Sequence, residues 1–379
     1  MNTESFHYFY QLTEGAIALV GALLLLFIWN NIRLRFQKKL DEDDSQKRVD
    51  KGLLYLSLAI LAWVVKGFVL VFFGISNPII YQGSLVFFSL VNSLFFVLAL
   101  FYFDHAPEFL YRNKKNVFRI ILGFVLISIV SFALFILYDQ DSVSEFQVSS
   151  LPDLLFSFLL SYLLIYSFYK TFKERQLKYI AYFSVAAILL LFVSQLPEII
   201  PVIDSGGLYV DFLRLVSKST LISLCLVLAT SWVIELAETP TPSEMSIKFL
   251  DWQLIELNIP SKGIHQEKID FGTKATQFRN LLKFAIRRKY APVDERSIEI
   301  IKDGEIQGQV YLSRIMDDIN AKLSEKMADR KDVFIFIGLG KYRVRFLPEN
   351  IFIEETLLHE FVGEKENKQY SDFISSNFL

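Results

Sequence analysis

The chain has 379 residues, of which 53% are hydrophobic and 37 are phenylalanine, and its mean hydropathy is +0.37. Soluble domains of this length rarely reach that hydrophobicity, so the composition indicates a lipid-facing surface. The formal net charge is only −2, which excludes a polycation that binds nucleic acid over its whole surface. The single cysteine, Cys225, excludes a disulfide framework, a cysteine-based zinc site and a haem attachment motif.

Seven apolar stretches are long enough to cross the hydrocarbon core of a bilayer, which takes about 20 helical residues. Their predicted limits are Gly15–Arg35, Gly52–Ile75, Ile80–Phe103, Val117–Tyr138, Leu154–Phe172, Leu177–Ile200 and Tyr209–Leu236. None alternates polar with apolar residues as the strands of a membrane barrel do. The sequence therefore predicts an integral membrane, all-α, seven-helix bundle over residues 1–237. In this pattern the N-terminal half resembles a bacterial seven-transmembrane sensor module.

Basic residues are confined to the odd-numbered connections between these stretches. The first connection carries seven Lys and Arg residues, and the third and fifth carry four each. The even-numbered connections, Ser76–Ile79, Asp139–Asp153 and Pro201–Leu208, carry none. Because basic loops remain in the cytoplasm, the sequence predicts an external N-terminus and a cytoplasmic C-terminus, in a bacterial inner membrane.

The composition changes after the seventh stretch. Two prolines, Pro240 and Pro242, predict a linker over residues 238–244. Residues 245–362 have the pattern of a mixed α+β domain. Trp252–Ile259 and Val333–Ile337 are predicted strands, and Thr276–Lys289 and Val310–Leu323 are predicted amphipathic helices. The polar tail, residues 363–379, is expected to be loose except for its last aromatic residues.

Three segments of this domain follow one another in the order helix, helix and β-hairpin. They are KATQFRNLLKFAIRRK (274–289), QVYLSRIMDDINAKL (309–323) and VFIFIGLGKYRVRF (333–346), the last with a glycine-aromatic turn at Gly338–Tyr342. The stretch Thr273–Phe346 resembles the winged-helix output domain of the OmpR/PhoB class of bacterial response regulators. The resemblance implies a cytoplasmic winged-helix-like domain with a recognition helix, a β-hairpin wing and DNA as a partner. Tyr290–Gly308 departs from the pattern because it contains no clear second helix.

The resemblance also implies which residues contact DNA. Lys341, Arg343 and Arg345 alternate with apolar residues in the predicted wing, which places the three cations on one face of a strand, suited to phosphates. Arg314 and Asn320 lie on the polar side of the predicted recognition helix and are the candidates for reading bases. The alternative is a module of the same shape that binds a cytoplasmic protein or the bilayer surface.

Ionisable and amide side chains inside the apolar stretches are candidates for a ligand site, because they are costly to bury in lipid. At 1.5 Å per helical residue, several of them fall in one layer in the outer half of the bundle, with Glu14 and Asp211 near its rim. This layer predicts a pocket for a small anionic ligand. The candidate residues are Lys66, Asn92, Glu198, Arg214 and Lys218. The alternative is a structural ion pair, such as Lys66 or Lys218 with Glu198.

No catalytic constellation is present in the sequence. It has no GxSxG, HExxH or P-loop motif, and only four histidines. We therefore expect no enzyme activity, metal or cofactor. The sequence favours a receptor-like membrane signal transducer, of which a membrane-bound transcriptional regulator, acting as a homodimer, is one form. The alternatives are a transporter or channel component, and a membrane anchor for a protein-interaction module.

Overall fold

The computed structural model describes residues 3–73, 78–102, 107, 114–139, 151–194, 196, 208–302, 304–323, 326–338 and 340–375. The chain forms two compact units. The helical unit comprises Met1–Arg35 and Arg48–Val233. The C-terminal unit comprises Ile234–Leu379 together with Phe36–Lys47, a segment from the first predicted connection. The C-terminal unit therefore contains a part of the chain that lies some 200 residues upstream of the rest of it.

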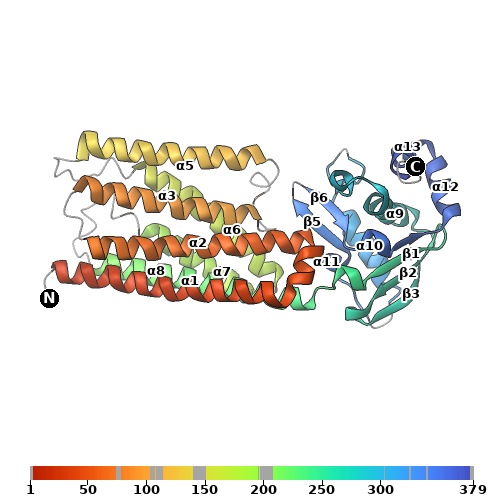
Figure 1. The fold of residues 1–379 in the computed structure, drawn as a ribbon, viewed down its shortest axis with the longest axis horizontal. Helices are drawn as coiled ribbons and strands as arrows, with labels where there is room; N and C mark the ends of the chain where they lie inside the picture. Colours follow the sequence, from red (N-terminus) through yellow and green to blue (C-terminus); the bar gives the residue numbers. More distant parts are fainter. Residues whose placement is uncertain are drawn as a thin grey trace. The chain divides into compact units, whose positions relative to one another are not determined.

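Long apolar helices, running lengthwise beside one another, make up the helical unit (Figure 1). The helices are α1 (Thr3–Glu42), α2 (Asp44–Phe73), α3 (Pro78–Tyr102), α5 (Lys114–Leu134), α6 (Leu151–Glu174), α7 (Lys178–Val193) and α8 (Leu208–Glu238). Five of the described helices, α1, α2, α3, α5 and α8, are long and apolar enough to cross a membrane. α6 has 24 residues, and α7 is a shorter apolar helix of 16 residues. These helices are compatible with a multi-pass membrane protein.

The outer surface of these helices is itself apolar. Large hydrophobic side chains are exposed along them, including Phe27 at 67%, Phe72 at 73% and Leu137 at 72%. Small residues such as Ala18 and Ala22 are buried between the helices instead. This inverted arrangement is typical of helices surrounded by lipid, where small residues allow close helix packing.

Two small sheets and several helices form the C-terminal unit (Figure 1). The first sheet has the order β3-β2-β1-β7, in which β1 (Ser246–Phe249), β2 (Leu254–Ile259) and β3 (Ile264–Asp270) are antiparallel and β7 (Ile351–Ile353) pairs parallel to β1. The second sheet has the antiparallel order β4-β6-β5, with β4 (Ile298–Glu299), β5 (Phe334–Gly338) and β6 (Lys341–Val344). The helices are α9 (Ala275–Tyr290), α10 (Val310–Asn320), α11 (Arg330–Val333), α12 (Glu355–Gly363) and α13 (Lys368–Ser375).

The two predicted amphipathic helices are present as α9 and α10. α9 buries Phe278, Leu281 and Ala285, and α10 buries Leu312, Ile315, Met316 and Ile319, which are the apolar faces that the sequence predicts. Between them the described residues contain a short 3₁₀ turn and strand β4 and no second helix. The departure noted in the sequence is therefore a feature of the fold.

The tail after Gly363, expected to be loose except for its last aromatic residues, contains helix α13, so the expected looseness is wrong for Lys368–Ser375, while the exception for the aromatic residues agrees with the structure. Helix α13 packs on the domain, and Tyr370 is fully buried, with its ring 5.4 Å from that of Phe361. Arg287 of α9 lies 5.5 Å from the centroid of the Tyr370 ring. The polar composition of the tail hid one apolar face of a single short helix.

The segment predicted as a linker, residues 238–244, is not a free connection. α8 continues to Glu238, and the next four residues, Thr239–Pro242, are buried in the C-terminal unit. The unit boundary falls earlier, at Ile234, inside α8. Residues of this proline-containing segment are held in place by contacts with the distant segment Phe36–Lys47, since Thr239 accepts a hydrogen bond from Lys39 and Ser243 donates one to Glu42.

Candidate functional site

Close helix contacts in the helical unit are built on glycines. A Cβ atom added to Gly67 of α2 would lie 3.1 Å from the Cα atom of Gly15 and 3.2 Å from the carbonyl oxygen of Gln11, both on α1. A Cβ atom added to Gly21 of α1 would lie 2.3 Å from a methyl group of Ile222 on α8. Helix α1 therefore lies tightly against both α2 and α8.

These contacts place a carboxylate in the interior of the helical unit. Glu14, the neighbour of Gly15, is only 7% exposed and forms an ion pair with Lys218 of α8. The Tyr10 hydroxyl donates a hydrogen bond to the same carboxylate. The Lys218 ammonium also lies 5.7 Å from the centroid of the Trp63 ring on α2, a favourable cation–π distance. We call Tyr10, Glu14, Trp63, Lys66 and Lys218 the polar cluster.

The other predicted ligand residues are distributed around this cluster. Lys66, the neighbour of Gly67, interacts electrostatically with Glu14 and belongs to the cluster. Arg214 donates through Nε to the Ser194 carbonyl oxygen at 3.0 Å. Asn92 of α3 donates to the carbonyl oxygen of Ala59 on α2 at 2.7 Å, and so ties two helices together. Glu198 lies outside the described residues.

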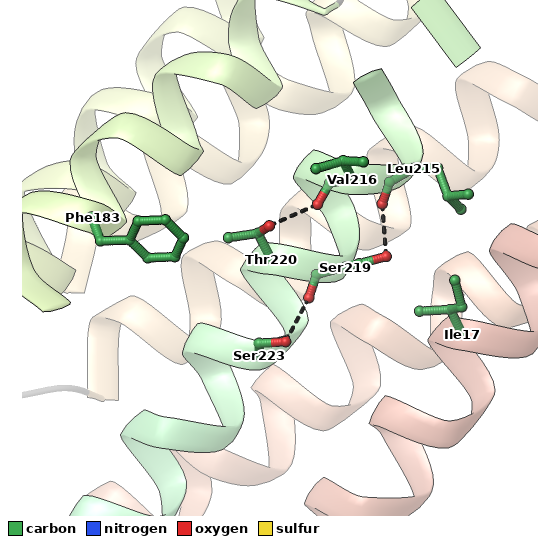
Figure 2. Close-up of a pocket in the computed structure, with 7 residues that line it drawn as sticks. All are labelled: Ile17, Phe183, Leu215, Val216, Ser219, Thr220 and Ser223. Carbon is green, nitrogen blue, oxygen red and sulfur yellow. Dashed lines mark hydrogen bonds between the residues drawn. The ribbon is translucent and has the colours of Figure 1, made fainter. Parts of the chain in front are cut away.

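An open pocket with a volume of about 380 Å³ lies about one helical turn from the polar cluster along the chain, since Ile17 follows Glu14 and Leu215 precedes Lys218 by three residues (Figure 2). Its walls come from three helices: Ile17 of α1, Phe183 of α7, and five residues of α8, namely Leu215, Val216, Ser219, Thr220 and Ser223. The three hydroxyl groups donate to backbone carbonyls of their own helix, as the dashed lines in Figure 2 show. The pocket therefore presents a largely apolar wall that touches both α1 and α8.

A second buried ion pair lies in the C-terminal unit. Arg345, at the end of the hairpin, pairs with Asp43 from the segment Phe36–Lys47, and both side chains are at most 3% exposed. The Nε and Nη2 atoms of Arg345 donate to the carbonyl oxygen of Lys331, at 3.1 and 2.6 Å. Burial lowers the pKa of the Arg345 guanidinium to about 9, so the group is still charged at neutral pH.

Further polar contacts join the same segment to the end of α8. The Lys39 ammonium donates to the carbonyl oxygens of Leu236, at 2.9 Å, and of Thr239, and so satisfies the C-terminal end of α8. The Glu42 carboxylate accepts a hydrogen bond from the Ser243 backbone at 3.0 Å. The ends of α1 and α8 are therefore tied to each other within the C-terminal unit.

The expected DNA-binding face is only partly present. Arg345 and Arg343 are buried, at 3% and 8% exposure, so the prediction that the wing presents three cations to phosphates is wrong for these two. The Asn320 amide donates to the Ala328 carbonyl at 3.0 Å and accepts from its N–H at 2.9 Å, so it closes a loop and does not point into open space. Arg314 is exposed and Lys341 is half-buried.

Sequence reasoning did not identify the partners of Lys218 and Arg345. It proposed Glu198 as the partner of Lys218, whereas Glu14 takes that place. It assigned no role to Asp43, which stands in a run of four acidic residues, Asp41–Asp44. Every charge buried in an apolar environment requires a partner, and this rule could have suggested Glu14, which the sequence places only at the rim of the polar layer, as the partner of Lys218.

Among the described residues, no group of three His, Cys, Asp or Glu side chains lies close enough to hold a metal ion. Comparison of the chain with protein-family models, with curated proteins and with solved structures finds no match. The helices define a largely helical protein with several apolar helices, compatible with a multi-pass membrane protein, and with a small C-terminal α+β unit.

Proposed function

We propose that this chain is a membrane signal transducer, in which a seven-helix bundle controls the cytoplasmic C-terminal unit. Five long apolar helices support the bundle, with α6 and α7 as the further two spans. The restriction of Lys and Arg to the odd connections supports an external N-terminus. Reporters fused after Pro240 are expected to be cytoplasmic and reporters at Ser144 external, and protease access to the C-terminal unit in intact cells would contradict this orientation.

One observation carries the proposal: α1 and α8 are joined by buried polar contacts twice. In the helical unit, Glu14 of α1 pairs with Lys218 of α8. In the C-terminal unit, Lys39 of α1 binds the last carbonyls of α8. In this proposal a change in the spacing of the two helices at the first contact reaches the second along α8 and, on the other side, along α1 through its non-helical kink at Phe36. A simple anchor needs neither contact.

The pocket beside the polar cluster is the proposed entry point for the stimulus. Because Ile17 belongs to α1 and Leu215 to α8, a molecule in the pocket contacts both helices. Its apolar wall favours an apolar or lipid-like ligand rather than the small anion expected from the sequence. A ligand shifts the equilibrium between two states only by its different affinity for them, and a pocket at the α1–α8 seam provides that difference.

For the output, we favour contact with another protein over DNA. The elements follow the winged-helix series of sheet, helix, helix and hairpin, but two wing cations and Asn320 are engaged inside the unit. The exposed stripe of α10 contains Val310, Ser313, Arg314 and Asp317, which are three or four residues apart and share one face. An apolar residue and an acid beside one arginine suit a protein surface better than a phosphate backbone.

Hydrogen exchange on the full chain in lipid nanodiscs tests the transducer proposal. Glu14→Gln removes the charge of the first contact. The transducer requires altered exchange protection at residues 36–47 and 235–244, which lie in the other unit. Thr13→Ala is the matched control, because it removes only a bond from the Thr13 hydroxyl to the Phe9 carbonyl oxygen.

If Glu14→Gln changes exchange in the helical unit alone, the transducer proposal is wrong and the anchor alternative stands. Substrate-dependent flux in vesicles containing the chain would support the transporter instead. Salt-sensitive, sequence-selective binding of DNA by the full chain would restore the DNA output.

A further inference from the structure

Two identical side-chain pairs occur on α6, in the sequence Tyr166-Ser-Phe-Tyr169-Lys170-Thr-Phe-Lys173. In each pair a lysine follows a tyrosine by four residues, the spacing that brings side chains together on a helix. The Lys170 ammonium lies 5.8 Å from the centroid of the Tyr166 ring, and the Lys173 ammonium lies 5.4 Å from that of Tyr169. The tyrosines therefore hold both ammonium groups against the helix by cation–π contact.

The neighbouring surface of α7 extends this aromatic face. The ring of Tyr182 lies 5.8 Å from that of Tyr169, and Tyr182 is 64% exposed. Tyr179, at the start of α7, is 92% exposed. Tyrosines with an apolar ring and a polar tip gather where a bilayer meets water. We call Tyr166, Tyr169, Lys170, Lys173 and Tyr182 the tyrosine–lysine patch.

The cations of this patch are not neutralised by the protein. Within the part of the chain that the structure describes, neither Lys170 nor Lys173 forms an ion pair. They are three residues apart on one helix, so like charges lie side by side and repel each other. The nearby Arg175 is directed elsewhere, since it donates to the Leu228 carbonyl oxygen at 3.1 Å and to the Ser231 hydroxyl.

We propose that the tyrosine–lysine patch binds the phosphate of an acidic phospholipid. An anion between Lys170 and Lys173 relieves their repulsion, and the half-buried ring of Tyr169 and the exposed ring of Tyr182 contact the glycerol and upper acyl region. A soluble phosphate leaves those rings unpartnered, which is why the lipid is the favoured source of the phosphate. The inference requires only that α6 and α7 lie in a bilayer and is independent of the signalling proposal.

Native mass spectrometry of the detergent-solubilised full chain, titrated with phosphatidylglycerol, tests the proposal. Each basic residue near a membrane surface contributes roughly 1 kcal/mol, so Lys170→Gln/Lys173→Gln is expected to weaken the first lipid-binding event about 30-fold. Lys170→Arg/Lys173→Arg should retain binding. Tyr166→Leu/Tyr169→Leu keeps both charges but loses the stacking, and should give an intermediate loss.

Arg35→Gln/Lys38→Gln is the matched control, because it removes two exposed cations of α1, also three residues apart, that have no tyrosine four residues before them. A much smaller loss in this variant supports an organised patch. Equal losses in both double variants, or none in Lys170→Gln/Lys173→Gln, would overturn the proposal. So would equal binding of phosphatidylcholine, or displacement of the lipid by millimolar inorganic phosphate.

Discussion

Removal of the Asp43 carboxylate is the most informative single change in the C-terminal unit. Asp43→Ala leaves the Arg345 guanidinium buried at 3% exposure without its anionic partner. The carboxylate comes from the first connection of the helical region, 302 residues before Arg345 in the chain. The loss of stability therefore measures how strongly that connection is built into the unit.

The size of the effect follows from the burial. Loss of one partner from a buried ion pair costs about 3–5 kcal/mol, because the remaining charge is left desolvated. Arg345 keeps two hydrogen bonds to the Lys331 carbonyl oxygen, so we expect the lower end, about 3 kcal/mol. At 1.4 kcal/mol per factor of ten, this is about a hundredfold loss of hydrogen-exchange protection.

Hydrogen exchange of the full chain provides the assay, with strand β6 and the segment Phe36–Lys47 as the reporting regions. Asp41→Ala is the matched control, since Asp41 is an exposed acid two residues away. The variant Asp43→Leu/Arg345→Leu should recover much of the loss, because a buried ion pair is replaced by apolar groups at little cost. Equal protection in Asp43→Ala and Asp41→Ala would refute the reasoning.

Three further variants test other parts of the structure. Lys218→Leu should lower the stability of the helical unit by about 3 kcal/mol, because Glu14 remains buried without its ammonium partner, and thermal unfolding in detergent measures the change. An unchanged unfolding midpoint would argue against a buried pair. Gly67→Ala should lower the stability of the helical unit by about 1–3 kcal/mol, because the added Cβ overpacks against the backbone of α1. Gly123→Ala on α5, where an added Cβ meets nothing within 4 Å, is the control and should be neutral or stabilising. Equal thermal unfolding midpoints for the two variants would contradict the close contact at Gly67. Burial raises the pKa of the Asp332 carboxyl group, so the folded state binds its proton more tightly than the unfolded state. The free energy of unfolding of the wild-type chain, compared with that of Asp332→Asn, should therefore rise as the pH falls through the raised pKa. A difference in unfolding free energy between the two proteins that stays constant from pH 7 to pH 4 would contradict this.

Local patterns in the sequence predict part of the C-terminal unit, namely α9, α10, β2 and the β5–β6 hairpin, but not α12 or α13. The apolar positions of α9 and α10 repeat at helical spacing, and each predicted helix begins within one residue of the observed one. The hairpin was predicted for the same reason, from alternation and a glycine turn. Propensity and periodicity depend only on near neighbours, so a single sequence contains this information.

The errors concern contacts between distant residues. Alternation in the segment Lys341–Phe346 predicts one cationic and one apolar face, but Arg343, Val344 and Arg345 are all buried, and Arg345 is paired with Asp43 from a distant part of the chain. The prediction for the tail does not include helix α13, whose Tyr370 packs against Arg287 of α9 and Phe361 of α12. Nothing in the local sequence reports such partners.

The burial of Asp43 also determines which residues the C-terminal unit needs in order to fold stably. A fragment that starts at residue 240 contains Arg345 but lacks Asp43, and it lacks Lys39, which binds the end of α8. Such a fragment carries a buried, uncompensated guanidinium, so its stability should match that of Asp43→Ala rather than that of the full chain. If the C-terminal unit folds fully only with the first connection in place, its stability depends on the segment that follows α1's apolar part, as the proposed transducer requires. The anchor alternative requires no such dependence, because an anchored module needs only a tether.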